Sequence, residues 1–67
     1  MILLNGRSCE LAGQQTLRAA LAELGLEPQA RGVAVAVDGE VVPRERWEAL
    51  ELPEGARVEI LTAMQGG

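Results

Sequence analysis

Two groups in this sequence could do chemistry: the thiol of Cys9, which is the only cysteine, and the carboxylate of Gly67, the last residue. The sequence has no histidine, so neither a histidine-based catalytic triad nor the usual zinc site can be built. No glycine-rich phosphate loop follows a strand and opens a helix. The ten acidic residues are scattered, which is typical of a solubilising surface. We therefore expect a chain that is not itself an enzyme and that binds no metal or cofactor.

The C-terminal end is the stronger of the two candidates. Gly66 and Gly67 follow shortly after an expected central strand, so residues 63–67 are predicted to form a flexible tail on a rigid base. Glycines have no Cβ atom and can enter a narrow tunnel. A five-residue tail reaches at most about 16–18 Å, enough to enter a partner's active site. We expect Met64, Gln65 and Gly66 to be needed for this entry and Gly67 to be the residue modified.

The Gly67 carboxylate is ionised and resonance-stabilised at neutral pH, so it is unreactive as it stands. Conversion to a mixed anhydride, such as an acyl-adenylate, would allow a sulfur nucleophile to add. A resulting thiocarboxylate keeps its sulfur anionic and tethers it to the protein, like a covalent group carrier. ATP and a sulfur donor would then be used through an activating partner, which holds the catalytic machinery.

Cys9 is expected to be part of the core, because free cysteine is among the most buried residue types. A reactive thiol needs a cationic neighbour or a helix N-terminus to stabilise the thiolate. Arg7 lies two residues away, but its side chain can equally extend into solvent and leave the thiol without a cationic neighbour. A redox or persulfide role for Cys9 stays the alternative.

The elements that position the tail follow from the pattern of apolar residues. Asn5-Gly6 and Asp38-Gly39 are typical of two-residue hairpin turns, since both dipeptides tolerate positive φ. They predict strands over residues 1–4 and 7–12, and over 33–37 and 40–42. Thr16 is expected to cap a helix whose apolar stripe is Leu17, Ala20, Leu21 and Leu24. Gly25 suits a left-handed C′ residue, Leu26 beyond it can pack back on the last turn, and Pro28 prevents continuation.

Residues 44–50 are expected to form a helical turn that places Trp47 and Leu50 on the sheet, and residues 57–61 form the last strand. The 33–37 strand is apolar on both faces, so we expect it inside the sheet or covered on both sides. A single helix in a chain with four or five short strands can bury its apolar stripe only by packing on one face of a mixed sheet. A right-handed crossover places the first and last strands side by side in parallel. We therefore predict an α+β, β-grasp (ubiquitin-like) domain over residues 1–62.

Charge and composition exclude several classes of function. The net charge is −4 and aromatic residues make up 1% of the chain, so nucleic acid is a poor partner. The longest apolar run has five residues, far short of the roughly 20 that a membrane span needs. A lone cysteine fits a reducing compartment, and no basic leader precedes the first strand. We expect a cytoplasmic protein.

Along nearly its whole length, the sequence resembles the bacterial thiamine-biosynthesis sulfur carrier proteins, the ThiS family. Two departures are Asp38, where asparagine is more common, and Ala56, where aspartate often stands. Neither touches the tail. The segments that carry the resemblance are Leu4-Asn5-Gly6, Thr16-Leu17, Val35-Ala36-Val37-Asp38-Gly39-Glu40, Val41-Val42-Pro43-Arg44 followed by Trp47, and Gln65-Gly66-Gly67.

The resemblance implies that Gly67 is adenylated by an E1-like activating enzyme of the ThiF type, converted to a thiocarboxylate, and used as sulfur donor by thiazole synthase of the ThiG type. Two alternatives stay open. One is a carrier for another pathway (molybdopterin, tRNA thiolation or cysteine synthesis), in which the tail chemistry is identical. The other is a non-catalytic ubiquitin-like docking module that never uses its terminus.

Overall fold

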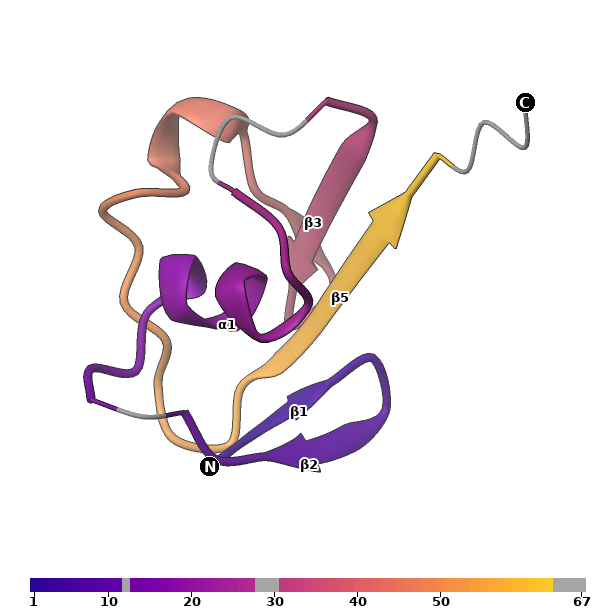
Figure 1. Cartoon of the computed structure of the whole chain (residues 1–67). Coiled ribbons are helices and arrows are strands. Elements are labelled where there is room, and N and C mark those ends of the chain that lie inside the picture. The colour runs from indigo at the N-terminus through magenta and orange to yellow at the C-terminus, as the bar shows by residue number, and fades with distance from the viewer. Residues whose placement is uncertain (12, 28–30, 64–67) are drawn as a thin grey trace.

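The computed structural model describes residues 1–11, 13–27 and 31–63 (Figure 1). The predicted helix stop at Pro28 lies outside these residues. The elements follow the predicted order, and only their ends differ. They are β1 (Ile2–Leu4), β2 (Arg7–Cys9), α1 (Leu17–Glu23), β3 (Val33–Val37), β4 (Glu40–Val41), the 3₁₀ turn η1 (Arg44–Arg46) and β5 (Arg57–Thr62).

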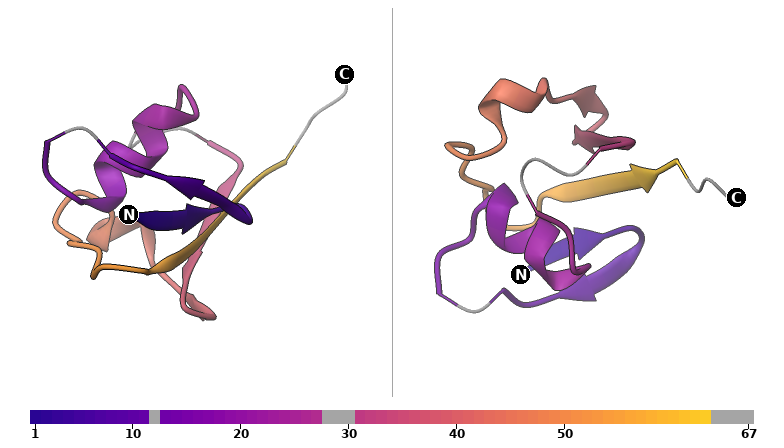
Figure 2. Two further views of the ribbon diagram at one scale, coloured as in Figure 1. Left: turned by 90° about the horizontal axis from the view of Figure 1, so that it is seen from below. Right: turned by 45° about the horizontal axis from the view of Figure 1, so that its top comes forward.

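The strands form one five-stranded mixed sheet with the order β2-β1-β5-β3-β4. β1 and β5 are parallel neighbours, and the other pairings, β1–β2, β3–β5 and β3–β4, are antiparallel. Helix α1 covers one face of the sheet (Figure 2). This is the β-grasp arrangement, and the prediction of parallel first and last strands is confirmed.

Both predicted hairpin turns are present and have the same backbone form. The φ angles are 52° at Asn5 and 85° at Gly6, and 51° at Asp38 and 87° at Gly39. Two consecutive positive φ values twist a two-residue turn in the sense that the strands twist, which is why Asn-Gly and Asp-Gly favour it. β2 ends at Cys9 rather than at the predicted residue 12, because its partner β1 begins opposite it, at Ile2.

Helix α1 begins as predicted, with the Thr16 hydroxyl accepting a hydrogen bond of 3.1 Å from the Ala19 N–H. Its C-terminal end differs from the expected stripe. Leu24 is the C-cap residue and is 43% exposed. Gly25, with φ of 74°, turns the chain so that Leu26 packs against the core while its N–H donates to the Leu21 carbonyl. Leu26 therefore packs against the core, whereas Leu24, which the stripe placed there, is exposed.

The core lies between α1 and the inner face of the sheet and is almost wholly aliphatic. Trp47 is buried in it as predicted, and its indole N–H donates to the Val42 carbonyl at 2.9 Å. Among the described residues no polar side chain is buried. The buried residues are Ile2, Leu4, Leu17, Ala20, Leu21, Val35, Trp47, Leu52, Ala56, Val58 and Ile60.

β3 lies inside the sheet, as expected, but its alanine face is less covered than its valine face, with Ala36 partly buried. Val35 is buried, and Val33 and Val37 pack against the core from partly buried positions. Ala34, on the opposite face, is exposed. The side of the sheet away from α1 is therefore open at Ala34.

Candidate functional site

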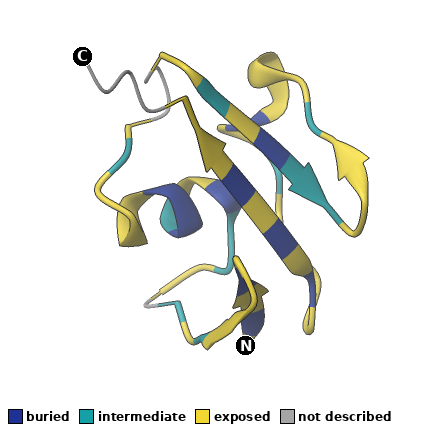
Figure 3. Ribbon diagram, turned by 90° about the vertical axis from the view of Figure 1, so that its right-hand side faces the viewer, coloured by how far each residue is buried: buried dark blue, intermediate teal, exposed yellow. Residues whose placement is uncertain are grey.

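The predicted site residues, Met64, Gln65, Gly66 and Gly67, lie outside the described residues. What the structure describes is the base from which they continue, namely β5 and Ala63. β5 is the central strand of the sheet, with β1 on one side and β3 on the other. Its side chains alternate, with Val58 and Ile60 buried and their neighbours exposed (Figure 3). β5 pairs with β1 over Arg57 and Val58, and with β3 from Val58 to Thr62.

The far end of β5 is held on the β3 side. Thr62 pairs with Val33, and the Ala63 N–H donates to the Gly32 carbonyl at 2.6 Å. Gly32 has φ of 68°, and a Cβ atom there would come within 3.3 Å of the Ala63 Cβ. Both facts favour glycine at this position. No motif in the sequence marks Gly32, whose only signal is its place directly before a strand.

On the β1 side, β5 is held by a side chain that the sequence pattern indicates only as a turn former. The Ile60 N–H donates to Asn5 Oδ1 at 2.7 Å, and Asn5 Nδ2 donates to the Ile60 carbonyl at 3.1 Å. The Asn5 backbone N–H adds a bond of 2.8 Å to the Val58 carbonyl. The hairpin signal placed Asn5 correctly but contained nothing about β5, which is 55 residues away.

The face of the sheet opposite α1 carries exposed apolar side chains close to the end of β5. Leu61 is 69% exposed and pairs across the sheet with the exposed Ala34. Val41, 79% exposed, pairs with Ala36 on the same face. We call Ala34, Ala36, Val41 and Leu61 the outer patch. A shallow, mainly apolar hollow of about 390 Å³ adjoins it, lined by Gly32, Val33, Ala34, Leu61, Thr62 and Ala63.

Cys9 lies on the edge strand β2, where it is partly buried and packs against the core. This position agrees with the expected structural role. The described residues contain no group of three or more cysteine, aspartate or glutamate side chains that could hold a metal ion.

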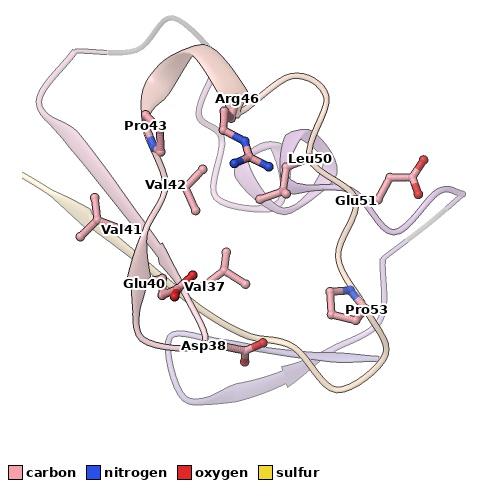
Figure 4. A pocket seen from close by; sticks show the side chains of 10 residues that line it. All are labelled: Val37, Asp38, Glu40, Val41, Val42, Pro43, Arg46, Leu50, Glu51 and Pro53. Carbon is pink, nitrogen blue, oxygen red and sulfur yellow. The ribbon is translucent and has the colours of Figure 1, made fainter.

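Arg44 and Arg46 are the two arginines of the 3₁₀ turn η1. The Arg44 guanidinium lies over the Trp47 ring, 4.3 Å from its centroid, which favours a packing role. Arg46 lines a groove of about 410 Å³, together with Val37, Asp38, Leu50, Glu51 and others (Figure 4). Asp38 in this groove hydrogen-bonds Arg57, the first residue of β5. The groove is thus at the end of β5 opposite to the tail.

Comparison with known proteins decides the family. The ThiS family model matches residues 2–67. The chain belongs to the ThiS family. It is 29% identical over 66 residues to the "Sulfur carrier protein ThiS" of Escherichia coli K12, covering 98% of this chain and 97% of that protein. The family predicted from the sequence is therefore confirmed.

Solved structures of a ThiS family member support the fold. The crystal structure of the thiamine biosynthesis protein ThiS of Geobacter metallireducens has a TM-score of 0.72 and 32% identity, covering 98% of this chain and 97% of that one. The solution structure of the Geobacter protein has a TM-score of 0.75 and 32% identity, covering 98% of this chain and 86% of that one. No helix in the described ranges is long and apolar enough to cross a membrane.

Proposed function

We propose that this chain is a sulfur carrier of thiamine biosynthesis whose working group is the carboxylate of Gly67. The observation that carries the proposal is the family match, which runs to Gly67 itself. The relative from Escherichia coli is named a sulfur carrier protein. β5, the central strand that leads into residues 63–67, is bonded to β3 up to Thr62 and to β1 and Asn5 up to Ile60, which supports a tail presented from a fixed base.

The chemistry requires two substitutions, the first at the α-phosphorus of ATP and the second at the acyl carbon of Gly67. A carboxylate oxygen of Gly67 attacks the α-phosphorus of ATP and pyrophosphate leaves, which gives an acyl-adenylate. A sulfide-level sulfur nucleophile then adds to the acyl carbon, and AMP leaves with the former carboxylate oxygen. The product is a thiocarboxylate in which one oxygen has been replaced by one sulfur. The chain contributes the acyl group and its presentation, and the partner enzymes contribute catalysis.

We infer two partners from this sequence of steps. An E1-like adenylating enzyme of the ThiF type makes the adenylate, and a thiazole synthase of the ThiG type consumes the thiocarboxylate.

The outer patch is the surface that we propose docks on the adenylating enzyme. It is apolar and exposed, and Leu61 is followed on the same chain by the tail that must enter the active site. The lone cysteine fits a cytoplasmic protein.

Intact-protein mass spectrometry tests the carrier chemistry. The chain is incubated with ATP, a sulfur source and a thiamine-pathway adenylating enzyme. We expect a mass gain equal to the replacement of one oxygen by sulfur, located at Gly67 by fragmentation. The matched control is the chain without Gly67, which should fold with the same melting temperature and gain no sulfur. A truncated chain that still takes up sulfur would refute the proposal.

The two alternatives give different results in the same experiment. A carrier of molybdopterin synthesis, tRNA thiolation or cysteine synthesis gains sulfur only with the adenylating enzyme of that pathway. A docking module gains sulfur with none of them. It also binds its partner normally with extra residues after Gly67, whereas a carrier with a blocked terminus is inactive.

A further inference from the structure

The two hairpin turns have the same backbone form but different bonds to β5. Asp38 donates its backbone N–H to the Arg57 carbonyl at 2.8 Å, and its Oδ1 accepts from the Arg57 N–H at 2.9 Å. Asn5 donates its backbone N–H to Val58, and its side chain then bonds both polar groups of Ile60. The turn residue of each hairpin thus extends the pairing of its own strand with β5, one on each edge.

The geometry shows why Asn5 does more than form a turn. β1 pairs with β5 through Leu3 opposite Arg57 and Leu4 opposite Val58, after which the chain turns away into β2. In a longer β1, two successive peptide groups would have bonded Ile60, one accepting from its N–H and the next donating to its carbonyl. The Asn5 carboxamide makes both bonds, because its oxygen and its NH₂ group lie on the same side-chain amide and can both face Ile60. It therefore supplies one additional step of parallel sheet without additional backbone.

The two positions differ in what their side chains must supply. At position 38 the β5 bond needs only an acceptor, which both aspartate and asparagine offer. At position 5 the same side chain must accept from the Ile60 N–H and donate to the Ile60 carbonyl, at 2.7 and 3.1 Å. A carboxylate has no donor and would place an oxygen against that carbonyl. Asn-Gly and Asp-Gly are interchangeable as turns, but only position 38 tolerates the exchange.

We propose that Asn5 is a positioning residue for sulfur transfer, and this role rests on the function proposed above. Ile60 is seven residues before Gly67, and the Asn5 bonds fix the β1 edge of β5 beyond the end of β1. Without them, Ile60 loses both of these partners and the base of the tail has a wider range of directions. Fewer docked complexes then bring the Gly67 carboxylate to the α-phosphorus of ATP in a reactive geometry.

The test measures kcat and KM for thiocarboxylate formation by a thiamine-pathway adenylating enzyme, with the full chain as the varied substrate. For Asn5→Asp we expect a fall in kcat of about tenfold, since small displacements of a reacting group have large effects. KM should change little, because the outer patch is not altered. Asp38→Asn is the matched control and should behave as wild type. Asn5→Gly keeps the left-handed backbone and removes only the side-chain bonds, so it gives the result if Asn5→Asp fails to fold.

The same kinetic measurement on the Thr16→Ala chain separates an effect on tail positioning from an effect of lower stability. This substitution removes the helix cap and lowers the melting temperature without touching β5. A fall in kcat for Thr16→Ala equal to that for Asn5→Asp would overturn the positioning role. The positioning role would also be overturned if Asn5→Asp and Asn5→Gly both fold and both show the kcat and KM of an active wild-type chain. A wild-type chain that accepts no sulfur would overturn the proposed function and this role with it, whereas the preceding outcomes leave the proposed function intact.

Discussion

Leu61→Ala is expected to weaken docking while leaving the fold almost unchanged. Leu61 is 69% exposed in the free chain. Fully burying a leucine side chain contributes about 1.5–3 kcal/mol, so the exposed part leaves about 1–2 kcal/mol for a partner to gain. Losing that energy raises the Kd for the adenylating enzyme about 5- to 30-fold. The free energy of unfolding should fall by only about 0.5–1 kcal/mol, because little of the side chain is buried.

Leu24 offers a matched control in the same chain. It is also a partly exposed leucine, at 43%, but it caps α1, which covers the other face of the sheet. Leu24→Ala removes at least as much buried surface, so its stability loss should equal or exceed that of Leu61→Ala. Its Kd should stay at the wild-type value. Isothermal titration calorimetry gives the Kd, and ATP–pyrophosphate exchange with the chain as varied substrate gives KM.

Either of two results would refute the reasoning about the outer patch. One is an equal rise in Kd for Leu24→Ala and Leu61→Ala, which would mean that affinity follows stability and not the face of the sheet. The other is a Kd for Leu61→Ala that stays within twofold of wild type. In that case, the adenylating enzyme docks elsewhere and the tail alone supplies the contact.

Two further predictions concern residues away from the tail. Cys9→Ser should keep full sulfur transfer and lose about 1 kcal/mol of stability, because a partly buried hydroxyl replaces an apolar thiol; loss of transfer in the folded variant would support a redox role instead. Trp47→Phe should lose about 1–3 kcal/mol, because the Val42 carbonyl loses its indole donor. Trp47 is the only aromatic residue, so the variant has no tryptophan fluorescence and its urea unfolding is followed by circular dichroism. An unchanged unfolding midpoint would show that the indole hydrogen bond contributes nothing.

The local features of this fold were predictable because the residues that determine them are neighbours in the sequence. Thr16 caps α1 within one turn, and Asn5-Gly6 and Asp38-Gly39 adopt positive φ through their own side-chain chemistry. The alternation of Val58 and Ile60 indicated which side of β5 faces the core. Such signals act over a few residues, so the pattern alone was enough to place them.

The exposure of Leu24 was not predictable in this way. Both leucines flank Gly25 at the end of α1; the helical spacing placed Leu24 on the apolar stripe, and the glycine favoured packing of Leu26 as well. The direction in which the chain leaves the helix decides which one reaches the core. That direction depends on the turn at Gly25 and on the sheet to which the chain returns, so Leu26 packs and Leu24 stays exposed.

The sequence by itself determined the hairpins, the helix, the order of the elements along the chain and the terminal glycines that suggest the chemistry. Only the tertiary structure decided that Ala34 on the outer face of β3 is exposed, that Gly32 bonds Ala63, and that Asn5 and Asp38 bond opposite edges of β5. The reason is physical: these contacts join residues up to 55 positions apart. Their existence depends on which strands become neighbours, and no local preference of a residue records its neighbour in the sheet.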